Sequence, residues 1–289
     1  VFFTSIIRDK KGRKMSKSLG NSPDPLDLIA QYGADALRFS IMRIAPTGTD
    51  VRFIENKSKD SDSGTECPQV EEGRNFANKL WNASRFRQMQ GGPEGLTRLP
   101  DIENLSIYDI DILSKLDALR EDISASYSAY KFQEIANKLY DFFWSEFCDW
   151  YLESIKQYFR EDADSERRDT VLIVVDIVFA RFLQQLHPYM PHITEELWEK
   201  LGFAVDGALL MNAHLPEDPV MKGFDSKIVE RAKERTNAIH EATTRARHLK
   251  AQYNLAANRN VKFFLHPSVE WASNELVTLK ILSGAGEVS

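Results

Sequence analysis

Two lysines three residues apart, Lys14 and Lys17, lie near the start of the chain in the string GRKMSKSLGN at 12–21. Glycines at both ends of this string permit backbone geometries that are closed to other residues, and its serines add hydroxyl donors. Such a loop could close over a polyphosphate and stabilise the charge that grows as a bond to phosphorus breaks, an effect often worth about 3 kcal/mol per group. The alternative is a solvated basic turn.

The elements that must position this loop are predicted from the hydrophobic pattern. VFFTSIIRD at 1–9 is rich in β-branched and aromatic residues and predicts a strand directly before the loop. After it, prolines open a helix that should end at Gly33. The following segments are expected to be a second helix (ADALRFSIMRIA), a short extended piece at 49–53, and a polar linker or surface loop at 55–66.

From about residue 67 the chain is predicted to be helical. The segment 130–159 is apolar nearly all round, which indicates a central helix of a bundle. Other helices are expected at 68–89, 107–128, 168–186 and 187–201, the last after a turn at two prolines. These lengths suit an up-and-down bundle. The tail differs: a basic helix at 225–250, a strand at 260–267 and a helix at 271–282 predict a small α/β unit.

Charge is unevenly distributed along the 289 residues. The formal net charge is −6, yet residues 1–20 carry +5 and residues 227–262 carry +6, which leaves −17 for the remainder. Basic ends on an acidic middle are compatible with a polyanion held at particular places. Ordinary charge scatter on exposed helices is the alternative.

Other classes of protein are disfavoured by composition. Cys67 and Cys148 are too few and too far apart for a metal cluster or a disulfide scaffold. The longest apolar run, at 171–183, is too short to span a bilayer and contains Asp176 and Arg181. The first residue is Val rather than Met, so we expect an excised piece of a longer protein.

The loop string resembles a family signature. Lys-Met-Ser-Lys-Ser at 14–18, after a strand and before LGN, Pro and a helix, resembles the KMSKS motif of the class I aminoacyl-tRNA synthetases. The resemblance implies that Lys14 and Lys17 are the catalytic residues and that they contact the ATP phosphates. Met15, Ser16 and Ser18 complete the implied ATP-binding loop. Mg²⁺ would accompany the ATP in the full-length enzyme.

Two further strings narrow the resemblance. EEGRNFANKLWNASRF at 71–86 is most similar to valyl enzymes, in which such a string opens the anticodon-binding bundle. LHPYMPHITEELW at 186–198 fits the valyl, isoleucyl and leucyl group. The resemblance covers about 1–260. The His-x-Gly-His signature, most of the parallel sheet, the amino-acid pocket and the editing domain of the family are absent from the sequence.

The resemblance therefore implies a mainly α chain in three parts. These are the end of a class I catalytic domain with the KMSKS loop at 1–62, a helical anticodon-binding bundle at 63–218, and a truncated small α/β unit at 219–289. The intact cytoplasmic enzyme would join L-valine to tRNA(Val) with ATP, and this part alone would be inactive. We expect no structural metal, no membrane contact and no stable protein partner.

Candidate RNA contacts lie on the expected helix at 68–89. Arg74, Asn78, Trp81 and Arg85 share one face, and two arginines beside an aromatic ring suit phosphates and a splayed base. The alternative is that Trp81 packs inside the bundle and the arginines pair with carboxylates such as Glu71.

For several other groups of residues, a purely structural or solvent-exposed role is an alternative to a functional one. Cations of the basic helix, such as Arg231 and Lys250, could contact phosphate or could be solvated. The histidines show no metal-ligand spacing, and the aromatic cluster at 142–151 is expected to be core. The competing functions are an isoleucyl-type synthetase fragment and a stand-alone helical RNA-binding module.

Overall fold

The computed structural model describes residues 5–46, 48–57, 65–91, 98–160, 163–214, 218–265 and 270–289. It is mainly helical and divides into two compact units. Unit 1 comprises 1–96, 118–144 and 176–217, and unit 2 comprises 97–117, 145–175 and 218–289. The chain therefore passes between the units several times along continuous helices.

The first part of unit 1 is a small crossover. Strand β1 (Ile7–Arg8) pairs in parallel with β2 (Val51–Arg52), and helices α1 (Pro25–Tyr32) and α2 (Ala34–Ile44) lie between them in sequence. A parallel pair requires such a long connection. Asp24 caps α1 through a hydrogen bond from the Leu26 N–H (2.8 Å). The predicted strand at 1–9 is confirmed at 7–8, and residues 1–4 lie outside the described part.

The stretch at 55–66, expected to be a polar linker or surface loop, has paired ends. Strands β3 (Asn56–Lys57) and β4 (Thr65–Glu66) are antiparallel, and residues 58–64 lie outside the described part.

A helical bundle forms the rest of unit 1. It contains α3 (Pro68–Met89), the later half of α4 (Ile107–Ser128), α5 (Phe132–Asp141), the later half of α7 (Ser165–Leu186) and α8 (Pro191–Lys200). Stacked rings join these elements: Phe143 and Phe182 have centroids 4.7 Å apart. The bounds predicted for 68–89 and 107–128 are confirmed.

Helices α2 and α3 approach each other very closely at Gly73. A Cβ atom at this position would lie 2.4 Å from the Ser40 hydroxyl oxygen and 2.5 Å from the Ala36 carbonyl oxygen. Beside this contact, Phe39 of α2 stacks on Phe76 of α3 with centroids 4.8 Å apart. Only a residue without a side chain permits this packing.

The long helix expected at 130–159 is not uniform. Helix α5 continues into a π-helical segment (Phe142–Leu152), then α6 (Glu153–Ile155) and a 3₁₀ turn (Lys156–Phe159). Four aromatic side chains of the π segment are buried, namely Phe142, Phe143, Phe147 and Tyr151. An apolar run without a clear period predicts a helix here but not its winding.

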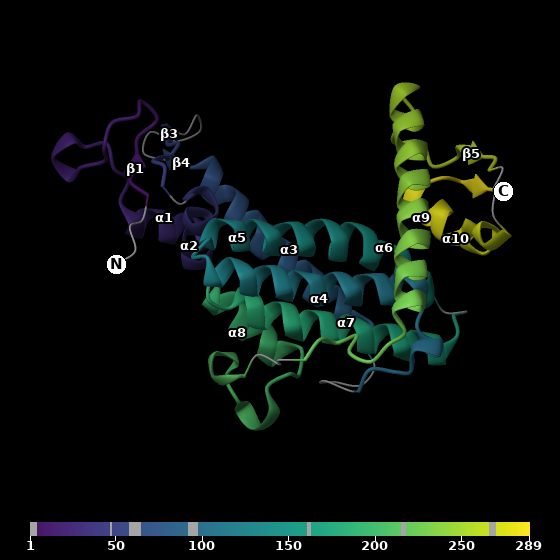
Figure 1. Ribbon diagram of the computed structural model, residues 1–289. Coiled ribbons are helices and arrows are strands. Elements are labelled where there is room, and N and C mark those ends of the chain that lie inside the picture. The colour runs from purple at the N-terminus through teal and green to yellow at the C-terminus, as the bar shows by residue number, and fades with distance from the viewer. Residues whose placement is uncertain are drawn as a thin grey trace. The chain divides into compact units, whose positions relative to one another are not determined.

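Unit 2 contains the predicted small α/β portion. Helix α9 (Ser226–Gln252) is followed by β5 (Lys262–Phe263), a 3₁₀ segment (Glu270–Glu275), α10 (Leu276–Ser283) and β6 (Glu287–Val288). Strands β5 and β6 are parallel, and α10 connects them and packs on α9, as Figure 1 shows.

Both units bury charged groups in pairs. In unit 1, the Arg87 guanidinium makes a bidentate contact with the Asp176 carboxylate at 2.6 and 2.7 Å. In unit 2, buried Asp109 accepts hydrogen bonds from Arg167 and from the Tyr151 hydroxyl. Within the described residues, no helix has both the length and the apolar character needed to cross a membrane.

Candidate functional site

The base of the lysine loop is organised by Asp9. Its carboxylate is only 7% exposed and accepts hydrogen bonds from the backbone N–H groups of Lys11 (3.0 Å) and Arg13 (2.8 Å). The Arg13 side chain and the Asn21 amide also donate to it, at 2.8 and 3.0 Å. Burial alone would raise the pKa of Asp9, but the bonds from Asn21 and Arg13 outweigh it and hold the pKa well below its usual range.

Asn21 closes the other side of the loop. Its amide oxygen accepts from the Ser16 N–H at 2.9 Å, and its amide nitrogen donates to the Lys14 carbonyl at 3.2 Å as well as to Asp9. One side chain therefore connects the start, middle and end of the loop. Gly20 follows the 3₁₀ turn Lys17–Leu19 with φ of 58°, a conformation that glycine adopts without strain.

Met15 anchors the middle of the loop. Its side chain packs against a core cluster of unit 1 that includes Leu28, Tyr32 and Ala36. This contact turns the methionine inward, while Lys14 before it is exposed and Ser16 after it is half-buried.

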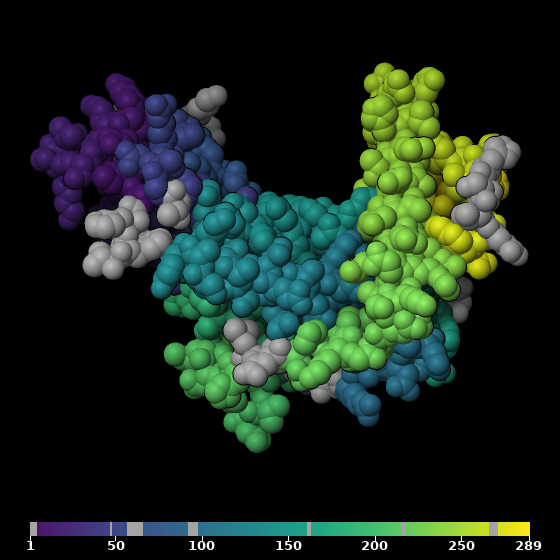
Figure 2. Space-filling model, viewed as in Figure 1, coloured from purple at the N-terminus to yellow at the C-terminus, as the bar shows by residue number. Residues whose placement is uncertain are grey.

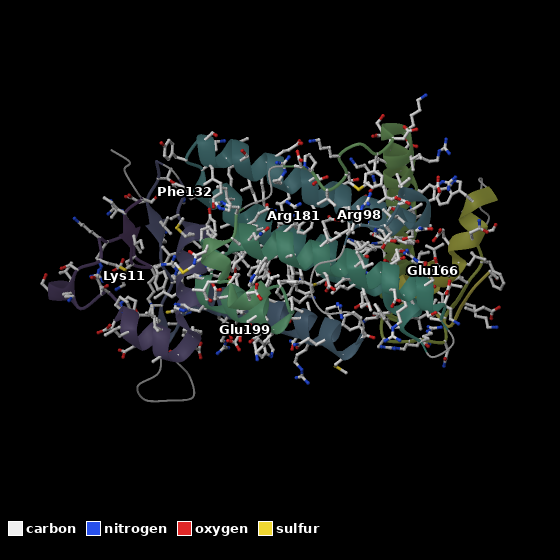
Figure 3. The ribbon with its side chains drawn as sticks, turned by 90° about the horizontal axis from the view of Figure 1, so that it is seen from below. Lys11, Arg98, Phe132, Glu166, Arg181 and Glu199 are labelled. Carbon is white, nitrogen blue, oxygen red and sulfur yellow. The ribbon has the colours of Figure 1, made fainter. Side chains whose placement is uncertain are left out.

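The two lysines that the sequence singles out are available to a ligand. Lys14 and Lys17 are exposed, and neither makes an ion pair with any described residue. In the same loop, the Ser16 and Ser18 hydroxyl oxygens lie 2.7 Å apart. Figure 2 shows the loop atoms in purple, open to solvent on the face seen, and Figure 3 labels Lys11 in the same loop. The result is two free ammonium groups on a fixed base, a suitable partner for phosphate oxygens.

The predicted RNA-contact face of α3 is at the surface. Asn78 and Arg85 are exposed and Trp81 is 37% exposed, so the alternative of a core tryptophan is wrong. Arg74 does pair with Glu71 (3.0 Å), as the alternative expected, and its guanidinium lies over the Tyr32 ring at 5.3 Å. The opposite side of α3 is buried.

A second surface in unit 1 alternates cations with aromatic rings, and we call it the cation–aromatic ladder. The Arg43 guanidinium lies 3.9 Å from the Tyr140 ring centroid, Tyr140 stacks on Trp144 at 5.4 Å, and the Lys79 ammonium lies 4.9 Å from the Trp144 centroid. Asn137 accepts a hydrogen bond from Arg43 at 3.1 Å and orients it. All four side chains of the ladder are partly exposed.

Sequence reasoning missed the ladder and assigned Trp144 to the core. The ladder joins residues of α2, α3 and the α5 region. The residue pattern of one helix cannot predict a contact among side chains from three different elements. The available signal was the four-residue spacing of Tyr140 and Trp144, which places both rings on one helix face.

The basic helix α9 is only partly available to a ligand. Arg231 and Arg245 are exposed and unpaired among the described residues. Arg247 and Lys250 instead donate to backbone carbonyl groups at the end of α10. Within the described residues, no group of three or more His, Cys, Asp or Glu side chains is placed to hold a metal ion.

Comparison with protein families decides the family of this chain. Residues 109–265 match the model described as the anticodon-binding domain of tRNA ligase, which is more than half of the sequence. The chain belongs to this family of tRNA ligases. Residues 1–54 match a second model, tRNA synthetases class I (I, L, M and V). Together these matches confirm the predicted class I segment followed by a helical anticodon-binding fold.

Curated relatives narrow the type of tRNA ligase. The chain is 34% identical over 302 residues to the valine–tRNA ligase of Aquifex aeolicus, covering 100% of this chain and 25% of that protein. It is 38% identical over 261 residues to that of Petrotoga mobilis (90% and 28%) and 44% identical over 209 residues to that of Prochlorococcus marinus (70% and 22%). The predicted valyl-type synthetase is thereby confirmed. The chain spans about a quarter of the length of these relatives.

Solved structures support the fold of this tRNA ligase chain. The ternary LeuRS–tRNA–LeuAMS complex of Agrobacterium radiobacter K84 has a TM-score of 0.53 at 18% identity, covering 74% of this chain and 23% of that one. Mycobacterium tuberculosis methionyl-tRNA synthetase with methionyl-adenylate has a TM-score of 0.52 at 17% identity (76% and 43%). Both share the helical architecture.

Proposed function

We propose that this chain is the part of a valine–tRNA ligase that supplies the ATP-phosphate loop and the anticodon-side grip on tRNA. The single observation that carries the first half is the lysine loop: Lys14 and Lys17 are exposed and unpaired within the described residues, on a base held by Asp9 and Asn21. Free cations on a fixed base are suited to a polyanionic nucleotide such as ATP with its Mg²⁺.

The loop would act on the first step of the reaction. A carboxylate oxygen of valine attacks the α-phosphorus of ATP, the bond from that phosphorus to the bridging oxygen breaks, and pyrophosphate leaves. Lys14 and Lys17 would stabilise the negative charge that moves onto the leaving phosphates, with Ser16 and Ser18 as additional donors. Met15 would contribute by anchoring the loop through its core contact.

The second half, tRNA binding, is supported by two surfaces of unit 1. The face of α3 presents Asn78, Trp81 and Arg85, and the cation–aromatic ladder presents rings already stacked between cations. Aromatic rings beside cations suit single-stranded loops, whose unstacked bases are held by stacking while phosphates are neutralised. An anticodon loop of tRNA(Val) has this character.

The proposed division of labour follows three stretches of chain. Residues 1–62 would belong to the cytoplasmic enzyme's catalytic domain, 63–218 would bind the anticodon arm, and 219–289 would form a small α/β unit. Valine selection would belong to other parts of the enzyme, so this chain alone should form no adenylate.

A test of the ATP role uses the full-length enzyme with Lys17→Ala. Loss of one charge that stabilises the leaving phosphates should slow valine-dependent ATP–pyrophosphate exchange by roughly 10²-fold or more. Lys11→Ala is the matched control, because Lys11 is an exposed lysine in the same loop whose backbone, rather than its side chain, contacts Asp9. Equal exchange rates in the Lys17 variant and the wild type would remove the role assigned to this lysine.

A further inference from the structure

A cleft in unit 2 is lined by an unusual excess of positive charge. It has a volume of about 830 Å³ and lies where the end of α9, the end of α10 and the 3₁₀ turn at 156–159 meet. Its lining includes six cations and one carboxylate, that of Glu153. The cations are Lys156, Arg160, Arg247, Lys250, Arg259 and Lys280.

Two of these cations are fixed in place with no counter-ion among the described residues. Lys250 is only 5% exposed, and its ammonium group donates to the carbonyl oxygens of Gly284 (2.7 Å) and Ser283 (3.4 Å). Arg247 donates to the Leu282 carbonyl oxygen at 2.7 and 2.9 Å. The carbonyl dipoles at the end of α10 offset part of this charge but carry no net charge of their own.

The other cations line the cleft with little neutralisation. Lys156 pairs with Glu153 at 2.6 Å. Arg160, Arg259 and Lys280 are exposed, and no carboxylate among the described residues pairs with them. Glu287, which feels the charge of Lys280, is itself paired with Lys262. The described residues of the lining therefore carry a local charge of about +5, on a chain whose net charge is −6.

We propose that this basic cleft binds phosphodiester groups of an RNA strand, as a second RNA contact separate from the surfaces of unit 1. This inference rests on the proposed function, because the RNA strand in the cleft would belong to the tRNA that the chain is proposed to bind. None of the described residues that line the cleft is aromatic, and its apolar lining consists of small or aliphatic residues such as Ala256 and Ile281. Such a surface neutralises phosphates without reading bases, so the contact is independent of sequence.

The experiment measures how the affinity of the 289-residue chain for a tRNA transcript depends on salt. Each phosphate contact contributes a slope of about 0.7–0.9 to the plot of log affinity against log salt, over about 50 to 200 mM. Arg259→Gln combined with Lys280→Gln should therefore lower the slope by about 1.4–1.8. The double variant Arg259→Lys and Lys280→Arg conserves both charges and should keep the wild-type slope. That result would show that substitution at these two positions does not disrupt the cleft.

The matched control is Lys227→Gln with Arg231→Gln, the same change of charge on the first turns of α9. Arg231 lies about 24 Å and Lys227 about 30 Å along the helix from Arg247, at about 1.5 Å per residue. An equal loss of slope in the control would mean that only total charge matters and would overturn the proposal. An unchanged slope in the cleft variant would also overturn it.

Two further outcomes separate the cleft from its alternatives. If inorganic phosphate displaced the RNA far better than chloride at the same ionic strength, the cleft would be a small-anion site and the RNA proposal would be wrong. If the wild-type chain did not bind the tRNA even at low salt, both this proposal and the proposed tRNA function would fail. If the wild-type chain bound the tRNA tightly and the cleft variant had the same salt slope, only the proposal for the cleft would be wrong.

Discussion

His240 shows how one residue's surroundings set its charge. Its ring stacks on Trp150 with centroids 3.9 Å apart, and the Arg247 guanidinium lies 5.1 Å from the same indole. Burial, together with the charges of Lys115 and Arg247, lowers the pKa of His240 to about 4. At neutral pH the imidazole is therefore uncharged in the folded chain.

This shift predicts a pH dependence of stability. The unfolded chain takes up the proton near pH 6.5, and the folded chain resists it until about pH 4. The free energy of unfolding should therefore fall as the pH drops through this window. We expect a fall of about 1–2 kcal/mol, which is less than the full pKa shift would give because the ring is partly accessible to solvent. Urea unfolding at several pH values would measure this; His240→Gln should flatten the dependence, whereas His248→Gln, at an exposed site on α9, should not.

Asn21 gives a second prediction for a single residue. Asn21→Ala removes its bonds to Asp9, to the Lys14 carbonyl and to the Ser16 N–H, each typically worth about 0.5–1.5 kcal/mol. Trypsin cleavage after the loop lysines should become faster by about tenfold, because cleavage follows the population of the opened loop. The melting temperature should change little.

Ser22→Ala is the control for Asn21, because among the described residues the Ser22 hydroxyl makes one long hydrogen bond, to the Pro23 carbonyl oxygen at 3.5 Å. A cleavage rate in Asn21→Ala no greater than in this control would show that the amide does not hold the loop.

At the scale of elements, the tie between α3 and α7 depends on a buried ion pair. Arg87 and Asp176 have side chains only 7% and 5% exposed. Burial raises the pKa of Asp176, and the Arg87 contact opposes that rise. Arg87→Met would leave an unpaired buried carboxylate and should lower the free energy of unfolding at pH 7 by about 3–5 kcal/mol.

The double variant Arg87→Met and Asp176→Leu should recover most of that loss, because an apolar pair of similar volume can replace a buried ion pair. Chemical denaturation of both variants and the wild type measures this. If the double variant were as unstable as the single one, the loss in free energy of unfolding would come from altered packing and not from the unpaired Asp176 carboxylate.

The elements were predictable to the extent that the sequence had a clear period. Helix α3 has the predicted bounds because its apolar positions recur at helical spacing and are buried on one face. Helix α4 also has the predicted bounds, although its first half is buried on all sides from Tyr108 to Ser114. The π winding at 142–152 was not predictable, because aromatic residues occur on all sides of that segment. In the loop, Lys14 and Lys17 were recognisable from their string, but Asp9 and Asn21 are twelve residues apart and meet only after the loop folds.

At the scale of the whole molecule, the proposed function requires an acidic chain to bind a polyanion at a few places. The ladder should contribute by stacking and the cleft by charge, so the two should respond differently to salt. Tyr140→Leu removes a stacked ring and should weaken binding of the tRNA transcript about tenfold, because one base stack is worth about 1–3 kcal/mol. This factor should be the same at every salt concentration.

Phe264→Leu is the control for the ladder, since Phe264 is an aromatic residue that is 74% exposed in unit 2. Fluorescence titration of both variants over a range of salt measures the factor. An equal loss in the control, or a loss that disappears at high salt, would contradict a stacking role for Tyr140.

The contact at Gly73 determines which parts of unit 1 can move. Because α2 and α3 meet there with no room for a methyl group, one helix cannot slide along the other without a collision of backbone and hydroxyl atoms. Helices α2 and α3 must then move together. We expect any movement of Lys14 and Lys17 toward a nucleotide to arise in the stretch between Asp9 and Asp24, which precedes both helices and acts as the hinge.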